Sequence, residues 1–360
     1  MAAPLPQEDL DHVLGHTREL WEDLRGQSVF LTGGTGFVGT WLLESLLWAN
    51  DRLSLGAHVV VLTREPERFR LGSPHLAGEP AVRLLAGDMI GFDFPEGTFA
   101  FVVHAATEAA VEPDAARPLG SFSRDVDGTR RVLEFASLHG TRRFLFTSSG
   151  AVYGKQPTAM THVSEDYVGA PLTTDTRSAY GQAKRASESM VALQSGACGF
   201  DAMIARLFAF VGPRLPLDAH YAVGNFIGDA LRGGPVRIAG DGTSSRSYLY
   251  AADLAIWLWT ILFRGKGAHP YNVGSPRELT IADLARTVIR VAAPRTTVEI
   301  ARPPVPGVPA ARYVPSTQRA DEELGLRPLI SLEDGIRRTA KWHRTPESSN
   351  LRAKTRSSVT

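Results

Sequence analysis

The segment that decides the fold is Val29-Phe30-Leu31-Thr32-Gly33-Gly34-Thr35-Gly36-Phe37-Val38-Gly39. A short apolar strand runs into three glycines spaced by two residues, Gly33, Gly36 and Gly39, and a helical pattern follows at 40–49. Glycine permits a tight turn and a close approach to a phosphate, and the free N–H groups of the next helix attract an anion. This order indicates a dinucleotide-binding site; a tight turn without a ligand is the alternative.

The composition limits the partners that this protein can have. The chain has 360 residues, 39 Lys and Arg against 38 Asp and Glu, and a net charge of +1, so we expect no nucleic-acid or membrane partner. A single cysteine, Cys198, excludes an internal disulfide and a Cys-built zinc site and suits a reducing compartment, and we expect no metal. Residues 1–22 are unlike a signal peptide, and the apolar run 254–263 is too short for a bilayer. We therefore expect a cytoplasmic protein.

Apolar runs alternate with helical patterns along the first half of the chain. The strands that we predict are 29–31, 58–62, 82–86, 101–104, 143–147 and 201–205, and the helices are 40–49, 122–139 and 180–193. Continuous apolar strands indicate an α/β fold of the Rossmann type, with a doubly wound parallel sheet buried on both faces.

The same patterns divide the chain into four parts. An N-terminal helical extension covers 1–26, with an amphipathic helix at 8–24, and a dinucleotide-binding domain covers 27–206. Residues 207–344 form a smaller mixed α/β substrate lobe that returns in part to the first domain. A Ser-, Lys- and Arg-rich tail at 345–360 is expected to be disordered.

The tip of the second predicted strand bears on the choice of cofactor. It reads Thr63-Arg64 and carries no acid for the ribose 2′-hydroxyl of NAD, whereas Arg64 can pair with a 2′-phosphate. This favours NADP over NAD; a surface arginine with NAD bound is the alternative. Asp88, after the third strand, can bond an adenine amino group or simply shape its loop.

Two further elements carry chemistry. Tyr180 and Lys184 are four residues apart on a predicted helix and therefore project from one face. A tyrosine titrates near pKa ~10, and lowering that by roughly 3 units is worth about 4 kcal/mol. A neighbouring ammonium and a positive nicotinamide ring both favour the phenolate. Ser149 follows another strand, where its hydroxyl can bond a substrate oxygen.

Taken alone, a Tyr and a Lys at this spacing are more often a chance pair on a surface helix, and Ser149 can belong to a simple turn. The order of glycine turn, hydroxyl loop and Tyr-x-x-x-Lys favours catalysis. Further motifs lie downstream: His104-Ala105-Ala106, Ala205-Arg206-Leu207-Phe208, Val211-Gly212-Pro213-Arg214, Asn225-Phe226-Ile227, Gly240-Asp241-Gly242 with Arg246, Tyr271-Asn272-Val273-Gly274-Ser275 and Glu323-Leu324-Gly325. With these motifs, residues 27–342 resemble the extended short-chain dehydrogenase/reductases that act on nucleotide sugars, such as the UDP-galactose 4-epimerases.

The resemblance implies a catalytic triad of Ser149, Tyr180 and Lys184. The cofactor contacts that we predict, besides Tyr180 and Lys184, are Gly33, Thr35, Gly36, Phe37, Val38, Gly39, Thr63, Arg64, Asp88, Met89, His104, Ala105, Ala106 and Thr147. The predicted substrate contacts are Thr107, Ser149, Gly150, Ala151, Tyr180, Asn225, Arg246 and Arg312, with Glu108 beside them. Asn225, Arg246 and Arg312 would hold a diphosphate, because a guanidinium suits phosphate.

Departures from the family pattern narrow the reaction. Dehydratases of this type carry Asp-Glu where this chain has Gly150-Ala151, and decarboxylases carry a Glu at the second of these positions, Ala151. We therefore expect an epimerase that works through a 4-keto intermediate with bound NAD(P). The alternatives are an NADPH-dependent reductase of a 4-keto nucleotide sugar and, less favoured, a decarboxylase, a dehydratase, an enzyme of non-sugar alcohols or a non-catalytic dinucleotide-binding protein. Relatives dimerise through two helices per subunit, here 122–139 and 180–194, so we expect a homodimer.

Overall fold

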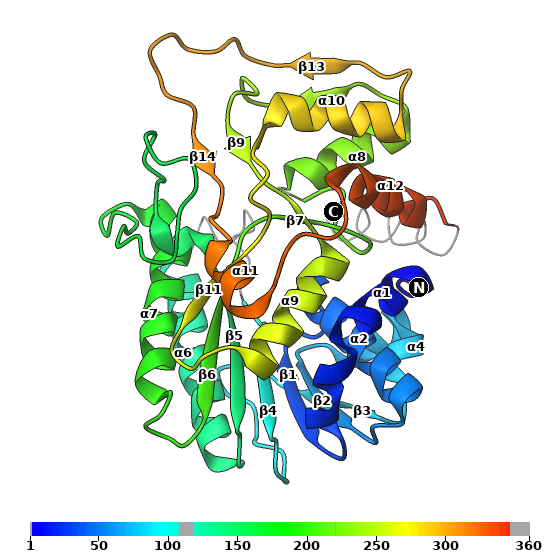
Figure 1. Ribbon diagram of the computed structural model, residues 1–360, viewed down its shortest axis with the longest axis vertical. Helices are drawn as coiled ribbons and strands as arrows, with labels where there is room; N and C mark the ends of the chain where they lie inside the picture. The colour runs from blue at the N-terminus through cyan, green and yellow to red at the C-terminus, as the bar shows by residue number, and fades with distance from the viewer. Residues whose placement is uncertain (1, 108–117, 220, 346–360) are drawn as a thin grey trace.

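The computed structural model describes residues 2–107, 118–219 and 221–345, which are built around a seven-stranded sheet (Figure 1). All neighbouring strands run parallel, in the order β11-β6-β5-β4-β1-β2-β3. Their bounds are β1 Ser28–Thr32, β2 His58–Thr63, β3 Val82–Ala86, β4 Phe101–His104, β5 Arg143–Ser149, β6 Asp201–Leu207 and β11 Pro270–Val273. The predicted doubly wound Rossmann-type sheet is confirmed, and every predicted strand is present to within two residues at either end.

The sheet is covered on both faces, and consecutive residues of one strand belong to the hydrophobic cores on opposite faces. Val29 and Leu31 pack with Trp41 in a core that includes α2 (Phe37–Leu53) and α9 (Ala251–Arg264). Phe30, between them, belongs to a second core against α6 (Pro118–Leu138). α7 (Ala179–Gln194) packs beside α6, whereas α3 (Pro66–Gly72) and α4 (Pro74–Ala77) lie near β3. The alternation follows from the two-residue period of a strand.

The N-terminal region differs from the single helix predicted at 8–24. It forms α1 (Gln7–Thr17) and then a 3₁₀ helix, η1 (Arg18–Leu24). Trp21 and Leu24 are both fully buried, and a three-residue period places them on one face, which an α-helix does less well. α1 packs on α9 and is tied to the rest of the chain through Asp9, which accepts a hydrogen bond from Tyr250 at 2.6 Å and pairs with Arg338.

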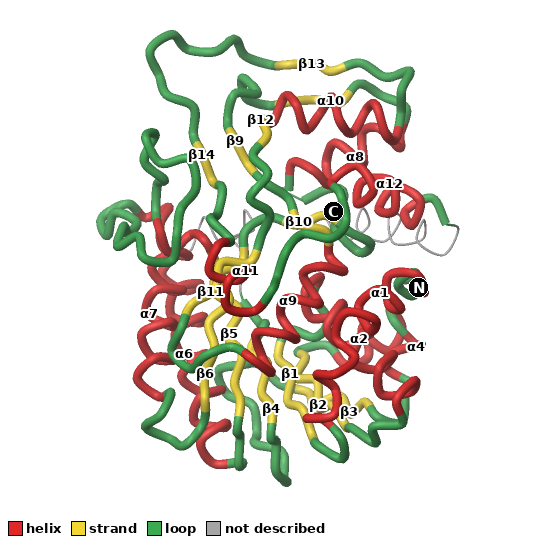
Figure 2. Tube along the Cα trace, in the orientation of Figure 1, coloured by secondary structure: helices red, strands yellow, loops and turns green. Residues whose placement is uncertain are grey.

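The C-terminal lobe lies above the carboxyl ends of the strands (Figure 2). It contains short strands and helices whose bounds are β7 Phe210–Val211, β8 Val236–Ile238, β9 Ser245–Arg246, β10 Leu249–Tyr250, β12 Leu279–Thr280, β13 Val298–Ile300, β14 Arg312–Tyr313, α8 Ala222–Arg232, α10 Ile281–Ala292 and α12 Leu332–His343. Between these, α9 packs on the sheet, β11 joins its edge and α11 (Gln318–Leu324) packs on β11.

The topology reverses between β1 and β4. These strands are neighbours, yet the chain leaves β1 for β2 on one side and leaves β4 for β5 on the other. Such a switch point opens a crevice at the carboxyl edge, where open α/β sheets bind their ligands.

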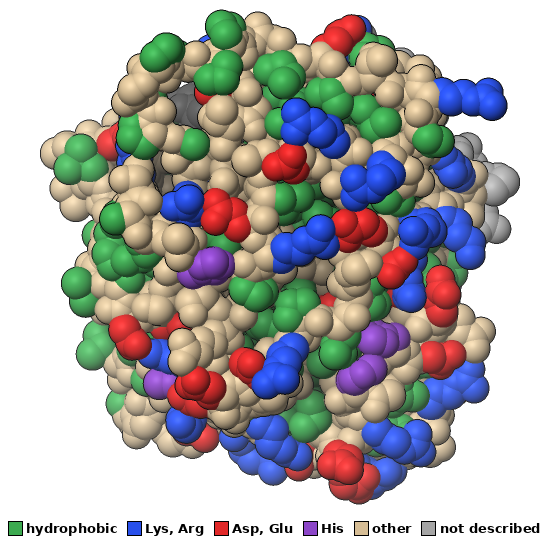
Figure 3. All heavy atoms as spheres, turned by 45° about the horizontal axis from the view of Figure 1, so that its top comes forward, with side chains coloured by type: hydrophobic (Ala, Val, Ile, Leu, Met, Phe, Trp, Pro, Cys, Tyr) green, Lys and Arg blue, Asp and Glu red, His purple; other side chains and the backbone are tan. Residues whose placement is uncertain are grey.

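The surface is mixed in charge. On the face shown in Figure 3, acidic and basic side chains are interspersed, in keeping with the net charge of +1. None of the helices in the described ranges is long and apolar enough to cross a membrane. The tail expected to be disordered falls almost wholly at 346–360, outside the described residues.

Candidate active site

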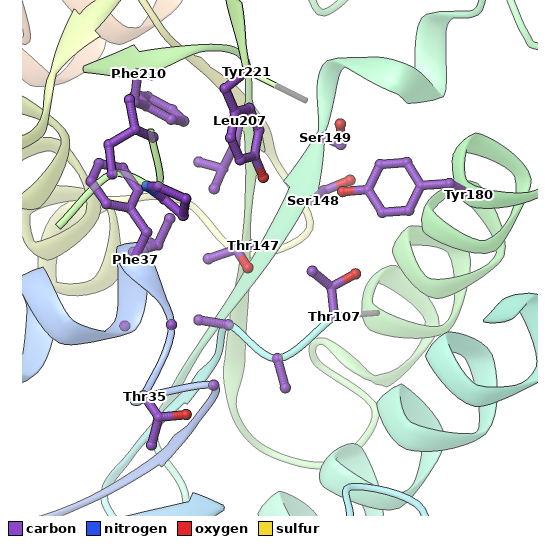
Figure 4. A pocket seen from close by; sticks show the side chains of 18 of the residues that line it. Thr35, Phe37, Thr107, Thr147, Ser148, Ser149, Tyr180, Leu207, Phe210 and Tyr221 are labelled. Atoms are coloured by element: carbon purple, nitrogen blue, oxygen red, sulfur yellow. The ribbon is translucent and has the colours of Figure 1, made fainter. Parts of the chain in front are cut away.

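A pocket of about 830 Å³ lies at the switch point, between the carboxyl ends of the strands and the lobe. The loops after β1, β2, β3 and β4 form one wall, and the end of β5 with α7 forms another (Figure 4). The remaining wall comes from the lobe and the segment that leads into it, and includes Phe208, Phe210, Tyr221, Tyr248, Arg246 and Tyr313.

The glycine turn forms the floor of the pocket at the start of α2. Gly33 has φ +71°, and a Cβ there would lie 2.5 Å from the carbonyl carbon of Ala105. A Cβ on Gly39 would lie 2.1 Å from the carbonyl oxygen of Gly33, so the helix meets the turn too closely for any side chain. Gly36 is less restricted and lines the pocket with Thr35, Phe37 and Val38. The first N–H groups of α2 have no partner within the helix, so this cradle fits a pyrophosphate.

The ends of β2 and β3 bring Thr63, Arg64, Asp88 and Met89 to the pocket. Thr63 is buried, whereas Arg64 is exposed. Asp88 accepts a hydrogen bond from the backbone N–H of Ile90 at 3.0 Å, which is the loop-shaping role given above as its alternative. The sequence prediction did not include Glu65, which also lines this end of the pocket.

His104 is not in the pocket. It is 1% exposed, with Nδ1 2.7 Å from the Thr32 hydroxyl and Nε2 3.2 Å from that of Thr129. Burial, and then the charge of Lys184, lower the pKa of His104 to about 3, so the ring is neutral and links two elements. Ala105, Ala106 and Thr107 after it line the pocket, whereas Glu108 lies outside the described residues.

Ser149, Tyr180 and Lys184 line the pocket together. Ser149 ends β5, and Tyr180 on α7 points its hydroxyl toward this end of the strand (Figure 4). The Lys184 ammonium donates to the carbonyl of Thr147 at 3.1 Å and lies 5.8 Å from the centre of the Tyr180 ring.

The protonation of this group is set by burial. Burial raises the pKa of Tyr180, and the hydrogen bond with Ser149 acts in the opposite direction. Burial lowers the pKa of Lys184, and the nearby carboxylates of Asp125 and Glu188 oppose that change. The phenol is therefore protonated in the protein alone, and a further positive charge is needed to make it a base.

A buried polar network links the strand that ends at Ser149 with the helix that carries Tyr180. Glu188 accepts hydrogen bonds from the Ser148 hydroxyl at 2.6 Å and from Arg206 at 2.9 and 2.7 Å. Arg206 also donates to Tyr153 at 2.8 Å, and Tyr153 donates to Asn272 on β11 at 2.7 Å. The signal for Glu188 was available in the sequence, because positions 180, 184 and 188 share one helix face.

The structure does not bring the three residues predicted to hold a diphosphate together in the pocket. Arg246 lines the pocket, but Asn225 and Arg312 do not. The Arg312 guanidinium donates to Glu278 at 2.9 Å and to the carbonyl of Thr158 at 3.0 Å. Its neighbour Tyr313 faces the pocket instead, because consecutive residues of a strand point to opposite sides.

Gly150 and Ala151 also lie outside the pocket lining. They form a 3₁₀ turn, η2 (Gly150–Tyr153), directly after Ser149. A Cβ at Gly150 would lie 2.6 Å from the Tyr313 hydroxyl and 2.7 Å from the Phe208 ring. These two side chains occupy the space into which an acid at this position would project.

Comparison with known proteins agrees with this geometry. The model of the NAD dependent epimerase/dehydratase family matches residues 29–274. UDP-glucuronic acid decarboxylase 1 of Arabidopsis thaliana is 31% identical over 311 residues, covering 86% of this chain and 68% of that protein. The corresponding protein of Danio rerio is 27% identical, covering 87% and 72%.

Solved structures place the chain in the same group. The UDP-glucose 4-epimerase of Thermus thermophilus in complex with NAD is 26% identical with a TM-score of 0.72, covering 89% of this chain and all of that one (100%). A dTDP-glucose 4,6-dehydratase from Streptomyces venezuelae with NAD bound is 25% identical with a TM-score of 0.74, covering 88% and 97%. The chain therefore belongs to the NAD dependent epimerase/dehydratase family, the nucleotide-sugar type of extended short-chain dehydrogenase/reductase.

Proposed function

We propose that this protein is a nucleotide-sugar epimerase that works through a 4-keto sugar with a bound dinucleotide. The observation that carries the proposal is the arrangement of Ser149, Tyr180 and Lys184 in one pocket with the glycine cradle, while positions 150 and 151 carry no acid. Dehydration needs an acid and a base for the elimination of water, and neither position supplies one.

When bound, the oxidised dinucleotide supplies the hydride-accepting chemistry that side chains lack. Tyr180, as a phenolate, takes the proton of the sugar 4-hydroxyl while C4 loses its hydride, which leaves a 4-keto sugar. Ser149 donates a hydrogen bond to the same oxygen, and Lys184 stabilises the phenolate. After the keto sugar presents its other face, Tyr180 returns the proton and C4 regains the hydride.

Decarboxylation is the second candidate, because the curated relatives named above are UDP-glucuronic acid decarboxylases. A 4-keto uronic acid is a β-keto acid, so its loss of CO₂ needs no side chain at position 150 or 151. A uronate, however, needs a cation for its carboxylate. Among the described residues the lining cations are Arg64, Lys184 and Arg246, and we assign Arg64 to the cofactor, Lys184 to the Tyr180 phenolate and Arg246 to the diphosphate. This favours the epimerase.

We also propose that the dinucleotide is NADP, with NAD as the alternative. Support comes from the neutral Thr63 and the exposed Arg64 at the end of β2. The two solved relatives described above carry NAD. An NADPH-dependent reductase of a 4-keto nucleotide sugar would use the same side chains and is tested together with the epimerase.

The deciding experiment follows the products from purified protein. UDP-glucose, UDP-galactose and UDP-glucuronic acid are incubated separately without added cofactor and followed by NMR, and CO₂ release is measured with the uronate. Interconversion of the two neutral sugars supports the epimerase. Release of CO₂ with formation of a UDP-pentose establishes the decarboxylase instead. Stoichiometric consumption of added NADPH with a 4-keto nucleotide sugar establishes the reductase.

A further inference from the structure

The motif Val211-Gly212-Pro213-Arg214 leads from β7 into the pocket. Leu215 and Pro216, which follow it, line the pocket on the side of the lobe. Trp41 lies one helical turn into α2, directly after the glycine cradle, and its indole N–H donates to the carbonyl of Pro213 at 3.1 Å. The motif therefore holds this part of the lobe against the helix that begins at the cradle.

Arg214 ends the motif in a strained backbone conformation. Its φ is +69°, in the left-handed region that residues other than glycine seldom adopt. Its side chain is only 10% exposed. Such a conformation persists only where the surrounding structure fixes it, so the contacts of the guanidinium have to supply that restraint.

The guanidinium of Arg214 lies where four parts of the chain meet. Glu44, on α2, is 6% exposed, and its Oε2 lies 3.5 Å from Nη2 of Arg214, which makes a buried ion pair. The guanidinium also donates to the hydroxyl of Ser73, between α3 and α4, and to the carbonyl of Ala3, both at 3.2 Å. Oε1 of Glu44 accepts from the N–H of Leu5 at 2.7 Å. One ion pair thus joins the lobe, α2, the junction of α3 with α4, and the N-terminal segment.

The ion pair is buried without being tightly bonded. Nε of Arg214 and Oε2 of Glu44 have no hydrogen-bond partner among the described residues, and 3.5 Å is longer than a charge-assisted hydrogen bond. The imidazole Nε2 of His75 lies 3.2 Å from Nη2 of Arg214 and 3.7 Å from Oε2 of Glu44. The pair can therefore separate without breaking a short hydrogen bond, as a contact must if it closes beside a ligand and opens to release it.

We propose that Arg214 is a positioning residue of the dinucleotide site, and that its pair with Glu44 slows the release of a bound dinucleotide by holding residues 213–216 against α2. The inference rests on the proposed function, in which the dinucleotide stays bound. An epimerase returns the hydride to the sugar from which it came, so its cofactor has no need to leave. A reductase has to exchange its cofactor after every turnover, and slow release would limit it.

The test measures the release of NADPH and of NADH in the absence of any sugar. Protein loaded with the reduced dinucleotide is mixed with an excess of the oxidised form, and the loss of nicotinamide fluorescence gives the dissociation rate. Arg214→Met keeps an apolar stem and removes the charge. We expect it to release the dinucleotide about tenfold faster than the wild type or more, because lost contacts act mainly on dissociation.

The matched control is Arg319→Met. Arg319 pairs with Asp166 and donates to the carbonyl of Pro270 at 3.0 Å, and its side chain is 16% exposed, yet it lies outside the pocket lining. Its loss removes a comparably buried arginine far from the proposed contact, so this variant should release the dinucleotide at the wild-type rate. Equally fast release from both variants would show a general loosening of the fold and overturn the proposal.

A second variant guards against a failure to fold, because Arg214→Met leaves the Glu44 carboxylate buried without its cation. Arg214→Met combined with Glu44→Gln removes both charges, and it should also release the dinucleotide faster, with its unfolding temperature recorded as the control for the fold. Folded variants that release both dinucleotides at the wild-type rate overturn the inference.

The result does not depend on which sugar the protein converts. Because no sugar is present, faster release from the Arg214 variants supports the inference even if none of the tested nucleotide sugars is turned over. A wild-type protein that binds neither dinucleotide overturns the proposed function, and the inference with it.

Discussion

At the scale of single residues, burial keeps Tyr180 protonated, whereas its proposed role as a base requires the phenolate. Burial raises the pKa of Tyr180 and lowers the pKa of Lys184, so burial disfavours the charged form of both side chains. A protein that keeps the phenol protonated until a positive ring is bound avoids a buried, unpaired charge in the meantime. The base is therefore expected to form only in the loaded enzyme.

Replacement of Tyr180 by Phe tests this role directly. We expect kcat to fall by roughly 10² to 10⁴, the usual contribution of a general base, with the dinucleotide still bound. Turnover is measured with the nucleotide sugar that the product assay shows to be converted, and the unfolding temperature is the control for the fold. An active Tyr180→Phe enzyme would remove Tyr180 from the mechanism.

Asp125 offers a substitution that should lower the pKa of Tyr180. Its carboxylate is 4% exposed, accepts a hydrogen bond from Thr107 at 3.0 Å and raises the pKa values of both Tyr180 and Lys184. Asp125→Asn removes the charge and keeps an acceptor for Thr107. The pKa of Tyr180 then falls, so the rising limb of the kcat–pH profile should move to lower pH. A limb that stays in place would show that Asp125 exerts no charge effect on the phenol.

Arg64 is the residue on which the NADP proposal depends. If its guanidinium pairs with a 2′-phosphate, Arg64→Ala should weaken NADP binding about tenfold or more and change NAD binding little. Titration calorimetry with both dinucleotides measures the difference. Equal losses of affinity for NAD and NADP would assign Arg64 to the adenosine that they share. No loss of affinity would mean that Arg64 does not contact the dinucleotide.

At the scale of elements, β5 and α7 act as one unit. Glu188 joins the serine strand, the tyrosine helix and β6 through Ser148 and Arg206. The Glu188–Arg206 pair is nearly buried, with side-chain exposures of 11% and 14%. Removal of one partner from such a pair leaves an uncompensated charge in the interior.

Glu188→Gln should therefore lower the free energy of unfolding by about 3 kcal/mol or more. Glu134→Gln is the matched control, because the Arg131–Glu134 pair is far more exposed and is worth at most about 1 kcal/mol. Urea denaturation of the two variants gives the comparison. Equal stabilities would mean that Glu188 only orients Ser148.

The sequence was sufficient for the elements that carry short-range signals. Six strands of the sheet, the glycine turn, and the helix with Tyr180 and Lys184 follow from apolar runs, glycine spacing and helical period, whereas β11 was not among the predicted strands. The wall of the pocket that the lobe provides could not be predicted from the sequence, because Phe208 and Tyr313 meet only through tertiary packing. On β14 the predicted pocket residue and the observed one differ by a single position. Tyr313 faces the pocket, whereas Arg312 turns to Glu278 on the other side.

At the scale of the whole molecule, the outer side of α6 and α7 is the surface proposed for dimerisation. These helices pack side by side and expose Leu119, Leu138 and Leu193 at 76%, 67% and 74%. If a second copy covers them, the wild type should sediment with the mass of two chains and Leu193→Arg with that of one. A wild-type protein that sediments as one chain at micromolar concentration would contradict the dimer.

The attachment of α1 has a consequence for handling the protein. Asp9 pairs with Tyr250 and Arg338, and Trp342 donates to the carbonyl of Pro4 at 2.9 Å, so the N-terminal segment is held against α12. Proteolytic trimming up to Leu24 would strip Trp259 of its aromatic neighbour Trp21 and leave the guanidinium of Arg338 without its carboxylate. A shortened chain should consequently precipitate on storage, even though every residue that lines the pocket is still present.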